Sequence, residues 1–348
     1  MQSLFHTVQR LRTLHTHRIT AMPIAILMPH SACNCKCVMC DIWKGNYQLS
    51  QLTRADIEQL LLTFRKLETK EVVMSGGEAL LNPAFFSFCE ILKTEQIKIT
   101  LLSTGLLIKK KVDDLLRWVD ELIISLDGDK ATHDRIRNVP GAFNLVRTGV
   151  AAIHERRPGF RISARTVIQR LNFRNWLSIV DAAKDMGLHH ISFLPADITS
   201  QAFNRIQPWE TPRQAEIRPA IQELPELQSI INELVLERSS FFENHFISES
   251  PGKIQKIYDY YAALYGLNAF PYKKCNAPWV SAVIEPDGMV RPCFFHQPIG
   301  NIHEESLEAI LNSRRALAFR RELDMQTDEI CTRCVCYLNL PPGKNPAN

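Results

Sequence analysis

Short β-prone runs alternate with stretches of helical length between residues 23 and 200, and this alternation most restricts the possible folds. Each helical stretch carries one apolar face, as Ile57, Leu60 and Phe64 illustrate. The six β-prone runs begin near Ile24, Val72, Ile97, Glu121, Arg161 and His190. Such alternation predicts a parallel α/β domain. Because no Rossmann glycine fingerprint or Walker sequence follows any run, we expect an open or incomplete barrel and not a doubly wound nucleotide-binding fold.

The whole chain divides into four segments by pattern. We expect a basic lead-in helix exposed to solvent at 1–22, a partial, TIM-like (β/α)6 barrel at 23–205, a helical bridge at 206–270 and a small cysteine-rich domain at 271–348. Within the last segment, Asp287 and Gly288 separate two short β-prone runs, which predicts a hairpin.

Charge and hydropathy exclude several classes of function. The 348 residues include 41 Lys and Arg against 37 Asp and Glu, and a net charge of +4 gives no reason to expect nucleic acid as a partner. No apolar run approaches the roughly 18 residues of a membrane span. The N-terminus lacks the apolar core of a signal peptide, so we expect a cytoplasmic protein.

Ten cysteines are unevenly distributed along the chain. Four of them, Cys33, Cys35, Cys37 and Cys40, lie within eight residues, and a second group near residue 331 is equally tight. In a reducing compartment such spacing predicts metal ligation and not disulfides.

The first group directly follows the first predicted strand. Cys33, Cys37 and Cys40 form a C-x3-C-x2-C pattern, and one loop with this spacing can hold an iron–sulfur cube. Three thiolates leave the fourth iron open, whereas a structural zinc site closes its shell with four ligands. Loops after the carboxyl ends of barrel strands are also where active-site groups gather.

This cysteine loop and its surroundings resemble the radical S-adenosylmethionine (SAM) superfamily. The motif Gly76-Gly77-Glu78 after the second strand resembles the family's GGE motif, which holds the SAM amino group. The resemblance implies a [4Fe–4S] cluster on Cys33, Cys37 and Cys40, with SAM bound at its open iron. The SAM contacts it implies are Met39, Gly76, Gly77, Glu78, Ser103, Ser125 and Arg165.

One further position, Asp127, completes the predicted site. Asp127, in the Ser125-Leu126-Asp127-Gly128 sequence after strand four, is the polar group we expect to meet SAM or substrate. Met39 stands where the family often has an aromatic residue on the adenine ring, and a thioether can make a similar contact. Cys35 is expected to be a small side chain outside the cluster.

The resemblance also implies the chemistry. Iron–sulfur clusters reach potentials of roughly −700 mV, so one electron from the cluster can cleave SAM to methionine and a 5′-deoxyadenosyl radical, which abstracts a hydrogen atom from substrate. An electron donor such as flavodoxin or ferredoxin would reduce the cluster. The protein must position the substrate and exclude solvent.

A second cysteine set lies in the C-terminal segment. Cys275, Cys293, Cys331 and Cys334 make a complete four-thiolate shell, which suits either zinc or a [4Fe–4S] cluster. The pattern C-x12-G-x4-C followed by C-x2-C resembles the SPASM/twitch extension of radical SAM enzymes. That resemblance implies one auxiliary [4Fe–4S] cluster, with Cys336 left over.

The expected function is therefore that of a radical SAM oxidoreductase acting on a small sugar-, cyclitol- or lipid-like molecule. The first alternative is a maturase of ribosomally made peptides, weakened by the short segment before the first strand, which has no room for a leader-binding domain. The second is a non-catalytic iron–sulfur or zinc protein. Conversion of SAM to 5′-deoxyadenosine would separate both enzyme hypotheses from the last.

Overall fold

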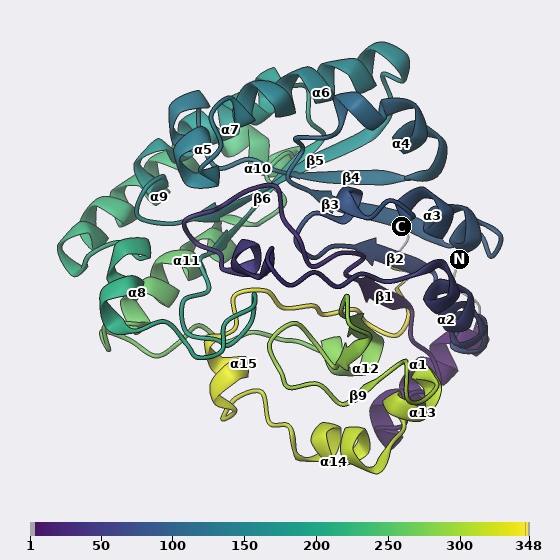
Figure 1. Ribbon diagram of the computed structural model, residues 1–348. Coiled ribbons are helices and arrows are strands. Elements are labelled where there is room, and N and C mark those ends of the chain that lie inside the picture. Colours follow the sequence, from purple (N-terminus) through teal and green to yellow (C-terminus); the bar gives the residue numbers. More distant parts are fainter. Residues whose placement is uncertain (1–3, 345, 347–348) are drawn as a thin grey trace.

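A nine-stranded sheet lies at the centre of the computed structural model, which describes residues 4–344 and 346. The outer ends of the first and last predicted segments therefore lie outside the described residues. All six predicted strands are present (Figure 1). They are β1 (Ile24–Leu27), β2 (Glu71–Met74), β3 (Lys98–Ser103), β4 (Glu121–Ser125), β5 (Arg161–Ile168) and β6 (His190–Pro195).

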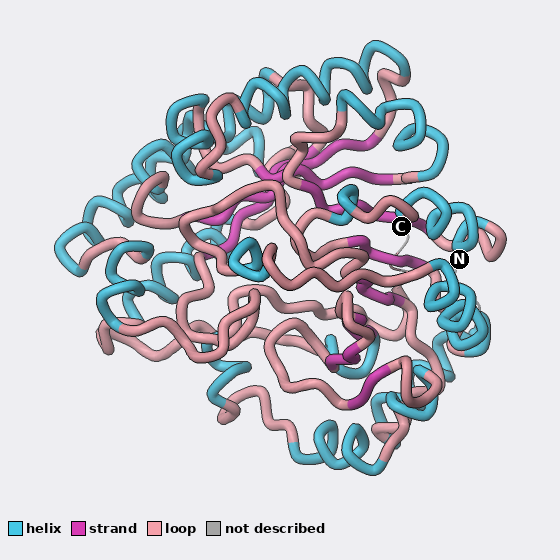
Figure 2. The backbone as a smooth tube through the Cα atoms, viewed as in Figure 1, coloured by secondary structure: helices cyan, strands magenta, loops and turns pink. Residues whose placement is uncertain are grey.

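The strand order is β6-β5-β4-β3-β2-β1-β7-β8-β9, and the pairs from β6 to β7 are parallel. The sheet does not close, so the predicted partial barrel is confirmed. Parallel pairing brings the carboxyl ends of these strands to one edge, where the loops drawn in Figure 2 gather between the sheet and the C-terminal helices.

The predicted hairpin exists, but it belongs to the same sheet. Its strands are β7 (Ser281–Ile284) and β8 (Met289–Arg291), followed by β9 (Gly300–Asn301). β7 pairs with β1 in parallel, with Ile24 opposite Ser281. The C-terminal segment therefore extends the barrel sheet beyond β1.

Helices cover the outer side of the strands in an arc (Figure 1). The first, α2, begins with a capping box in which Thr53 and Asp56 satisfy each other's backbone N–H groups. No helix among the described residues is long and apolar enough to cross a membrane. The helices of this arc are α2 (Arg54–Lys66), α3 (Phe85–Lys93), α4 (Val112–Trp118), α5 (Lys130–Arg137), α6 (Ala142–Arg156) and α7 (Trp176–Asp185).

The predicted helical bridge consists of α8 (Thr211–Ile217), α9 (Leu224–Glu237), α10 (Ser239–Glu243) and α11 (Pro251–Ala263). It protects the free edge of β6, since the Ile191 N–H donates to the Phe246 carbonyl and the Ile191 carbonyl accepts from the Ser248 N–H. The hydroxyl of Tyr261, on α11, donates to the Ile168 carbonyl and accepts from the Ala196 N–H. The bridge is thereby fixed to the carboxyl ends of β5 and β6.

The N-terminal segment forms the helix α1 (Leu4–Thr16), as predicted, but it is not simply exposed. Arg10 is buried, and its guanidinium donates to the carbonyls of Leu340 and Pro341 at 2.8 Å each. The basic helix therefore docks against the C-terminal segment, which also contains α12 (Ala277–Val280), α13 (Leu307–Leu311), α14 (Arg314–Glu322) and α15 (Glu329–Arg333).

Candidate functional site

The first cysteine loop leaves the carboxyl end of β1 and is held in place by its own polar neighbours. The side chain of Asn46 accepts from the Cys33 N–H at 3.0 Å and donates to the Cys33 carbonyl at 2.9 Å. The indole N–H of Trp43 donates to the Cys40 carbonyl at 2.9 Å. Both ends of the three-cysteine motif are therefore fixed by residues that follow it in sequence.

The centre of the loop is held by the C-terminal end of α5. The backbone N–H groups of Lys36 and Val38 donate to the carbonyls of Arg137 and Ile136, at 3.1 and 3.0 Å. The guanidinium Nη1 of Arg137 also approaches the Cys37 Sγ at 3.6 Å. A buried cation thus lies against one of the three predicted ligands.

Asp127 lies behind this arginine. Its carboxylate is fully buried, forms an ion pair with Arg137 and accepts from the Val167 N–H at 3.1 Å. A buried carboxylate with these partners can orient the guanidinium on Cys37. The predicted direct contact of Asp127 with SAM or substrate stays a prediction.

The thiols of the loop differ in acidity. A hydrogen bond from Cys35 and the nearby charge of Arg137 lower the pKa of the Cys37 thiol to about 7. Burial raises the pKa values of Cys33 and Cys40 to about 12. Cys37 is therefore the thiol of this loop closest to ionisation at neutral pH, and a bound metal must displace protons from the other two.

The Gly76-Gly77 pair packs directly on the cysteine loop. A Cβ on Gly77 would lie 2.1 Å from the Ala32 carbonyl oxygen, so only glycine fits there. Gly76 has a φ of +113°, which glycine adopts without strain. The N–H of Glu78 then donates to the same Ala32 carbonyl at 2.9 Å. The second motif is therefore joined to the first.

Glu78 is completely buried among hydrogen-bond donors. Its carboxylate accepts from the Ser103 hydroxyl at 3.0 Å, and from the N–H and hydroxyl of Thr104 at 2.8 and 2.7 Å. Burial raises the pKa of Glu78, and these hydrogen bonds oppose the rise. The predicted contacts Glu78 and Ser103 thus meet in one network at the ends of β2 and β3.

The remaining predicted SAM contacts lie on β4, on β5 and in the cysteine loop. Ser125, at the end of β4, is directly opposite Arg165 of β5 in the sheet register. The Nε of Arg165 donates to the Ser192 hydroxyl at 3.2 Å. Met39 is partly buried and packs against an apolar group that includes Trp209.

All ten cysteines are free, and five of them line one cavity in the C-terminal segment. These five are Cys275, Cys293, Cys331, Cys334 and Cys336. Burial raises the pKa of Cys293 to about 11 and raises those of Cys331 and Cys334 further. The thiol of Cys334 donates to the Cys336 carbonyl at 3.0 Å.

Two basic side chains also line this cavity. His296 is buried, and its Nε2 lies 3.3 Å from the Cys331 Sγ and 3.8 Å from the Asp328 carboxylate. Burial lowers the pKa of His296, which favours a neutral ring. Lys273 donates to the Thr332 carbonyl at 2.7 Å, and burial lowers its pKa to about 8.

The donor sets fit the two predicted clusters. The first loop offers three thiols next to glycine backbone and a carboxylate network, which suits a cluster with one open iron for SAM. The second cavity offers five thiols, enough to close the shell of an auxiliary cluster. The ligands would be the cysteines at 33, 37 and 40 in the first case, and at 275, 293, 331 and 334 in the second.

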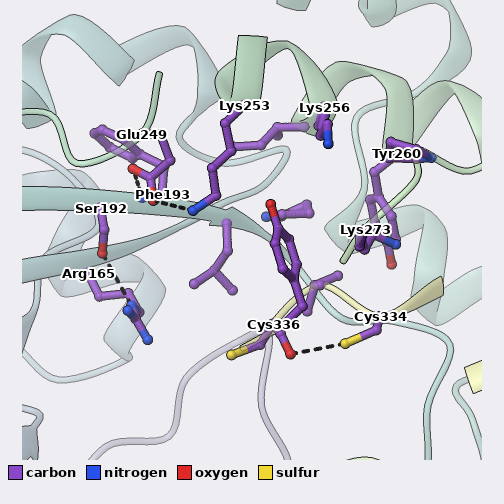
Figure 3. A pocket seen from close by; sticks show the side chains of 16 residues that line it. Arg165, Ser192, Phe193, Glu249, Lys253, Lys256, Tyr260, Lys273, Cys334 and Cys336 are labelled. Carbon is purple, nitrogen blue, oxygen red and sulfur yellow. Dashed lines mark hydrogen bonds and ion pairs between the residues drawn. The ribbon is translucent and has the colours of Figure 1, made fainter. Parts of the chain in front are cut away.

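A second cavity adjoins the cysteine cavity and extends to β5 and β6 (Figure 3). Its lining includes Arg165 on β5, Ser192 on β6 and Lys253 on α11. Cys334 and Cys336 line it as well, and both also belong to the cysteine cavity. A molecule bound there would lie beside the auxiliary ligands and near a predicted SAM contact.

Sequence reasoning missed Arg137 and His296. Arg137 stands two residues from the similar Arg135, which is exposed, and nothing in the local sequence separates the two. His296 follows Cys293 by three residues, and this short spacing was the one available signal.

Both cysteine groups lie largely in segments that match known protein families. The family model of the radical SAM superfamily matches residues 27–199, and that of an iron–sulfur cluster-binding domain, SPASM, matches residues 275–335. The antilisterial bacteriocin subtilosin biosynthesis protein AlbA of Bacillus subtilis is 25% identical over 81% of this chain and 57% of its own length. The AdoMet-dependent heme synthase of Methanosarcina barkeri is 26% identical over 47% of this chain and 48% of its own length.

This chain therefore matches only about half the length of these relatives. Among solved structures, Streptococcus suis SuiB bound to its precursor peptide SuiA superposes with a TM-score of 0.63 at 15% identity, covering 96% of this chain and 77% of SuiB. At that identity the likeness concerns the fold. The chain belongs to the radical SAM superfamily, binds SAM at a [4Fe–4S] cluster and carries a C-terminal iron–sulfur cluster-binding domain.

Proposed function

We propose that the protein is a radical SAM oxidoreductase whose substrate lies in the cavity between Arg165 and Cys334. The observation that carries this proposal is that Cys334 and Cys336 line both this cavity and the cysteine cavity. When bound, SAM and its cluster supply a radical that removes a hydrogen atom from substrate, and the auxiliary cluster supplies an acceptor for one further electron. A substrate between Arg165 and Cys334 would lose a hydrogen atom, one further electron and a proton released to solvent, which completes a two-electron oxidation in one site.

The side chains of this protein have three tasks in that reaction. Cys33, Cys37 and Cys40 hold the first cluster, and Arg137, oriented by Asp127, stabilises the charge on Cys37. Gly76, Gly77, Glu78, Ser103, Ser125, Arg165 and Met39 form the SAM site. The cysteines at 275, 293, 331 and 334 hold the auxiliary cluster. We expect a reducing, cytoplasmic setting, because closely spaced cysteines there are typical of metal ligation, and flavodoxin or ferredoxin as the electron donor.

We favour a small molecule as substrate. The cavity is bordered by strand ends, α11 and the C-terminal segment, and this enclosure suits a compact ligand. The second candidate is a ribosomally made peptide. The match with AlbA favours it, because that bacteriocin biosynthesis protein aligns with 81% of this chain.

The first experiment tests the reaction itself. Anaerobically reconstituted and reduced protein should convert SAM to 5′-deoxyadenosine, whereas the C37A variant should not. If the reconstituted protein forms no 5′-deoxyadenosine, the proposal is contradicted.

The second experiment separates the two substrate classes. Extracts of cells grown in deuterated medium are divided by ultrafiltration into a small-molecule and a peptide fraction, and each is incubated with enzyme and unlabelled SAM. Deuterium abstracted from substrate appears in 5′-deoxyadenosine. We expect it with the small-molecule fraction, and its appearance with the peptide fraction alone would favour a maturase.

A further inference from the structure

The cavity between Arg165 and Cys334 has an unusual charge. Four cationic side chains line it, from β5 (Arg165), α11 (Lys253 and Lys256) and the C-terminal segment (Lys273), together with a single carboxylate, Glu249. Figure 3 shows Lys253 extending from α11 toward Glu249, with Arg165 on the side of the strands. The cations therefore come from three separate parts of the fold and line one cavity.

Most of this positive charge lacks an acidic partner. Lys256 and Lys273 donate to the carbonyls of Tyr272 and Thr332. Among the described residues, one of these four cations is within salt-bridge distance of a carboxylate. This is Lys253, whose ammonium lies 3.6 Å from the Glu249 carboxylate. That pair is loose because the other oxygen of Glu249 accepts from the Phe193 N–H at 3.0 Å.

Two of the four cations have other tasks. Lys273 lies close enough to Cys331 and Cys334 for their charges to act on it, so thiolates ligating iron would balance its charge. Arg165 is a predicted SAM contact. Lys253 and Lys256 remain, and their i, i+3 spacing places both on one face of α11.

We propose that Lys253 and Lys256 bind an anionic group of the substrate, a carboxylate or a phosphate, and so hold the substrate between the two cluster sites. Ammonium groups in a partly enclosed cavity form charge-assisted hydrogen bonds with such anions. This inference rests on the proposed function, because only that function identifies the bound anion as the substrate. The anion site itself can be tested without turnover.

The test uses pyridoxal 5′-phosphate, an anionic aldehyde that forms imines with lysines, on the reconstituted holoprotein without SAM. Borohydride traps the imines, and peptide mass spectrometry measures labelling at each lysine. Pyridoxal, which lacks the phosphate, is the matched probe. We expect Lys253 and Lys256 to be labelled about tenfold faster by the phosphorylated probe, the effect of one charge-assisted hydrogen bond. Lys109 and Lys110, exposed and outside the cavity, should show no such preference.

Competition identifies the kind of anion. Glutarate and glycerol 2-phosphate are added separately, with glutaramide as the uncharged control. Protection of Lys253 and Lys256 by either anion, and not by glutaramide, supports the proposal, and the anion effective at the lower concentration indicates carboxylate or phosphate. Equal labelling by both probes, or protection by neither anion, would overturn it.

The K253Q/K256Q variant provides a second measurement, with Lys273 as a reporter in the same cavity. Anion protection of Lys273 should weaken about tenfold in this variant and stay unchanged in the matched K109Q/K110Q variant. Unchanged protection in K253Q/K256Q would also overturn the proposal. If the protein binds the anion but forms no 5′-deoxyadenosine, the proposed function fails and the anion site stands. The failure of the anion site and the failure of the proposed function are therefore distinguishable.

Discussion

The two cysteine regions use the same ligand chemistry in opposite ways. The first gathers its three predicted ligands from one loop, buries Cys37 to 6% exposure and places the cation Arg137 against its sulfur. The second gathers five thiols from separated parts of the C-terminal segment and places the neutral His296 against Cys331. The comparison indicates that the number of thiols decides whether a cluster is open or closed. We expect the neighbouring side chain to adjust the potential of each cluster.

The largest effect should come from removing ligands of one region at a time. C33A, C37A or C40A should lose about four iron atoms per chain and all formation of 5′-deoxyadenosine. C293A should also lose about four iron atoms but should still cleave SAM. Iron and sulfide analysis with product chromatography measures both, and C89A, a buried cysteine of α3, is the control. Loss of SAM cleavage in C293A with the first cluster intact would remove the distinction between the regions.

The next largest effect concerns Arg137. Its guanidinium stabilises the more negative, reduced cluster, so its loss should lower the potential of the first cluster. A charge-assisted hydrogen bond contributes about 1.5–3 kcal/mol. The lower value corresponds to a fall of about 60 mV for one electron, and we expect this in D127N/R137M, which avoids an unpaired buried carboxylate.

Redox titration followed by electron paramagnetic resonance, without SAM, measures that potential. R137K, which keeps the charge, should lie closer to the wild type than the double variant does. R135M, which removes the exposed neighbour, should leave the potential unchanged. An unchanged potential in D127N/R137M would show that Arg137 does not act on the cluster.

A smaller effect is expected at His296. A neutral hydrogen bond contributes about 0.5–1.5 kcal/mol, so H296F should lower the potential of the auxiliary cluster by about 20–60 mV and leave the first cluster unaffected. The same titration in the C37A background isolates the auxiliary signal. H303F, outside the cavity, is the matched control. If H296F shifts the potential of its cluster more than D127N/R137M shifts that of the first cluster, the proposed ranking of the two neighbouring side chains is reversed.

The smallest effect is expected for the surplus thiols. C336A and C35A should keep the wild-type iron content, because four other thiols serve the second cavity and three others the first loop. C334A should lose the auxiliary iron. If C336A loses about four iron atoms and C334A does not, then Cys336 is the fourth ligand.

Features that depend on neighbours in sequence were predictable. The six parallel strands follow from local periodicity, and the start of α2 follows from Thr53 and Asp56. The close spacing of Cys33, Cys37 and Cys40 was likewise readable from sequence, because a short loop brings its thiols together in any fold. These predictions needed no knowledge of which elements meet in space.

Features that depend on distant contacts were not predictable. The pairing of Ile24 with Ser281, which joins the C-terminal hairpin to the barrel sheet, has no local signal. Arg137 and Arg135 look equivalent until α5 packs on the cysteine loop, and Arg10 looks exposed until it meets the C-terminal carbonyls. The register and burial of each residue decide its role in these cases.

The most direct test of the account is the response of each cluster to SAM. Electron paramagnetic resonance is recorded on the reduced C293A/C331A/C334A variant and on the reduced C33A/C37A/C40A variant, with and without SAM. We predict that SAM changes the spectrum of the first variant, whose remaining cluster has an open iron, and leaves that of the second unchanged. A SAM-dependent change in the second variant, or none in the first, would contradict the assignment of SAM to the loop of Cys33, Cys37 and Cys40.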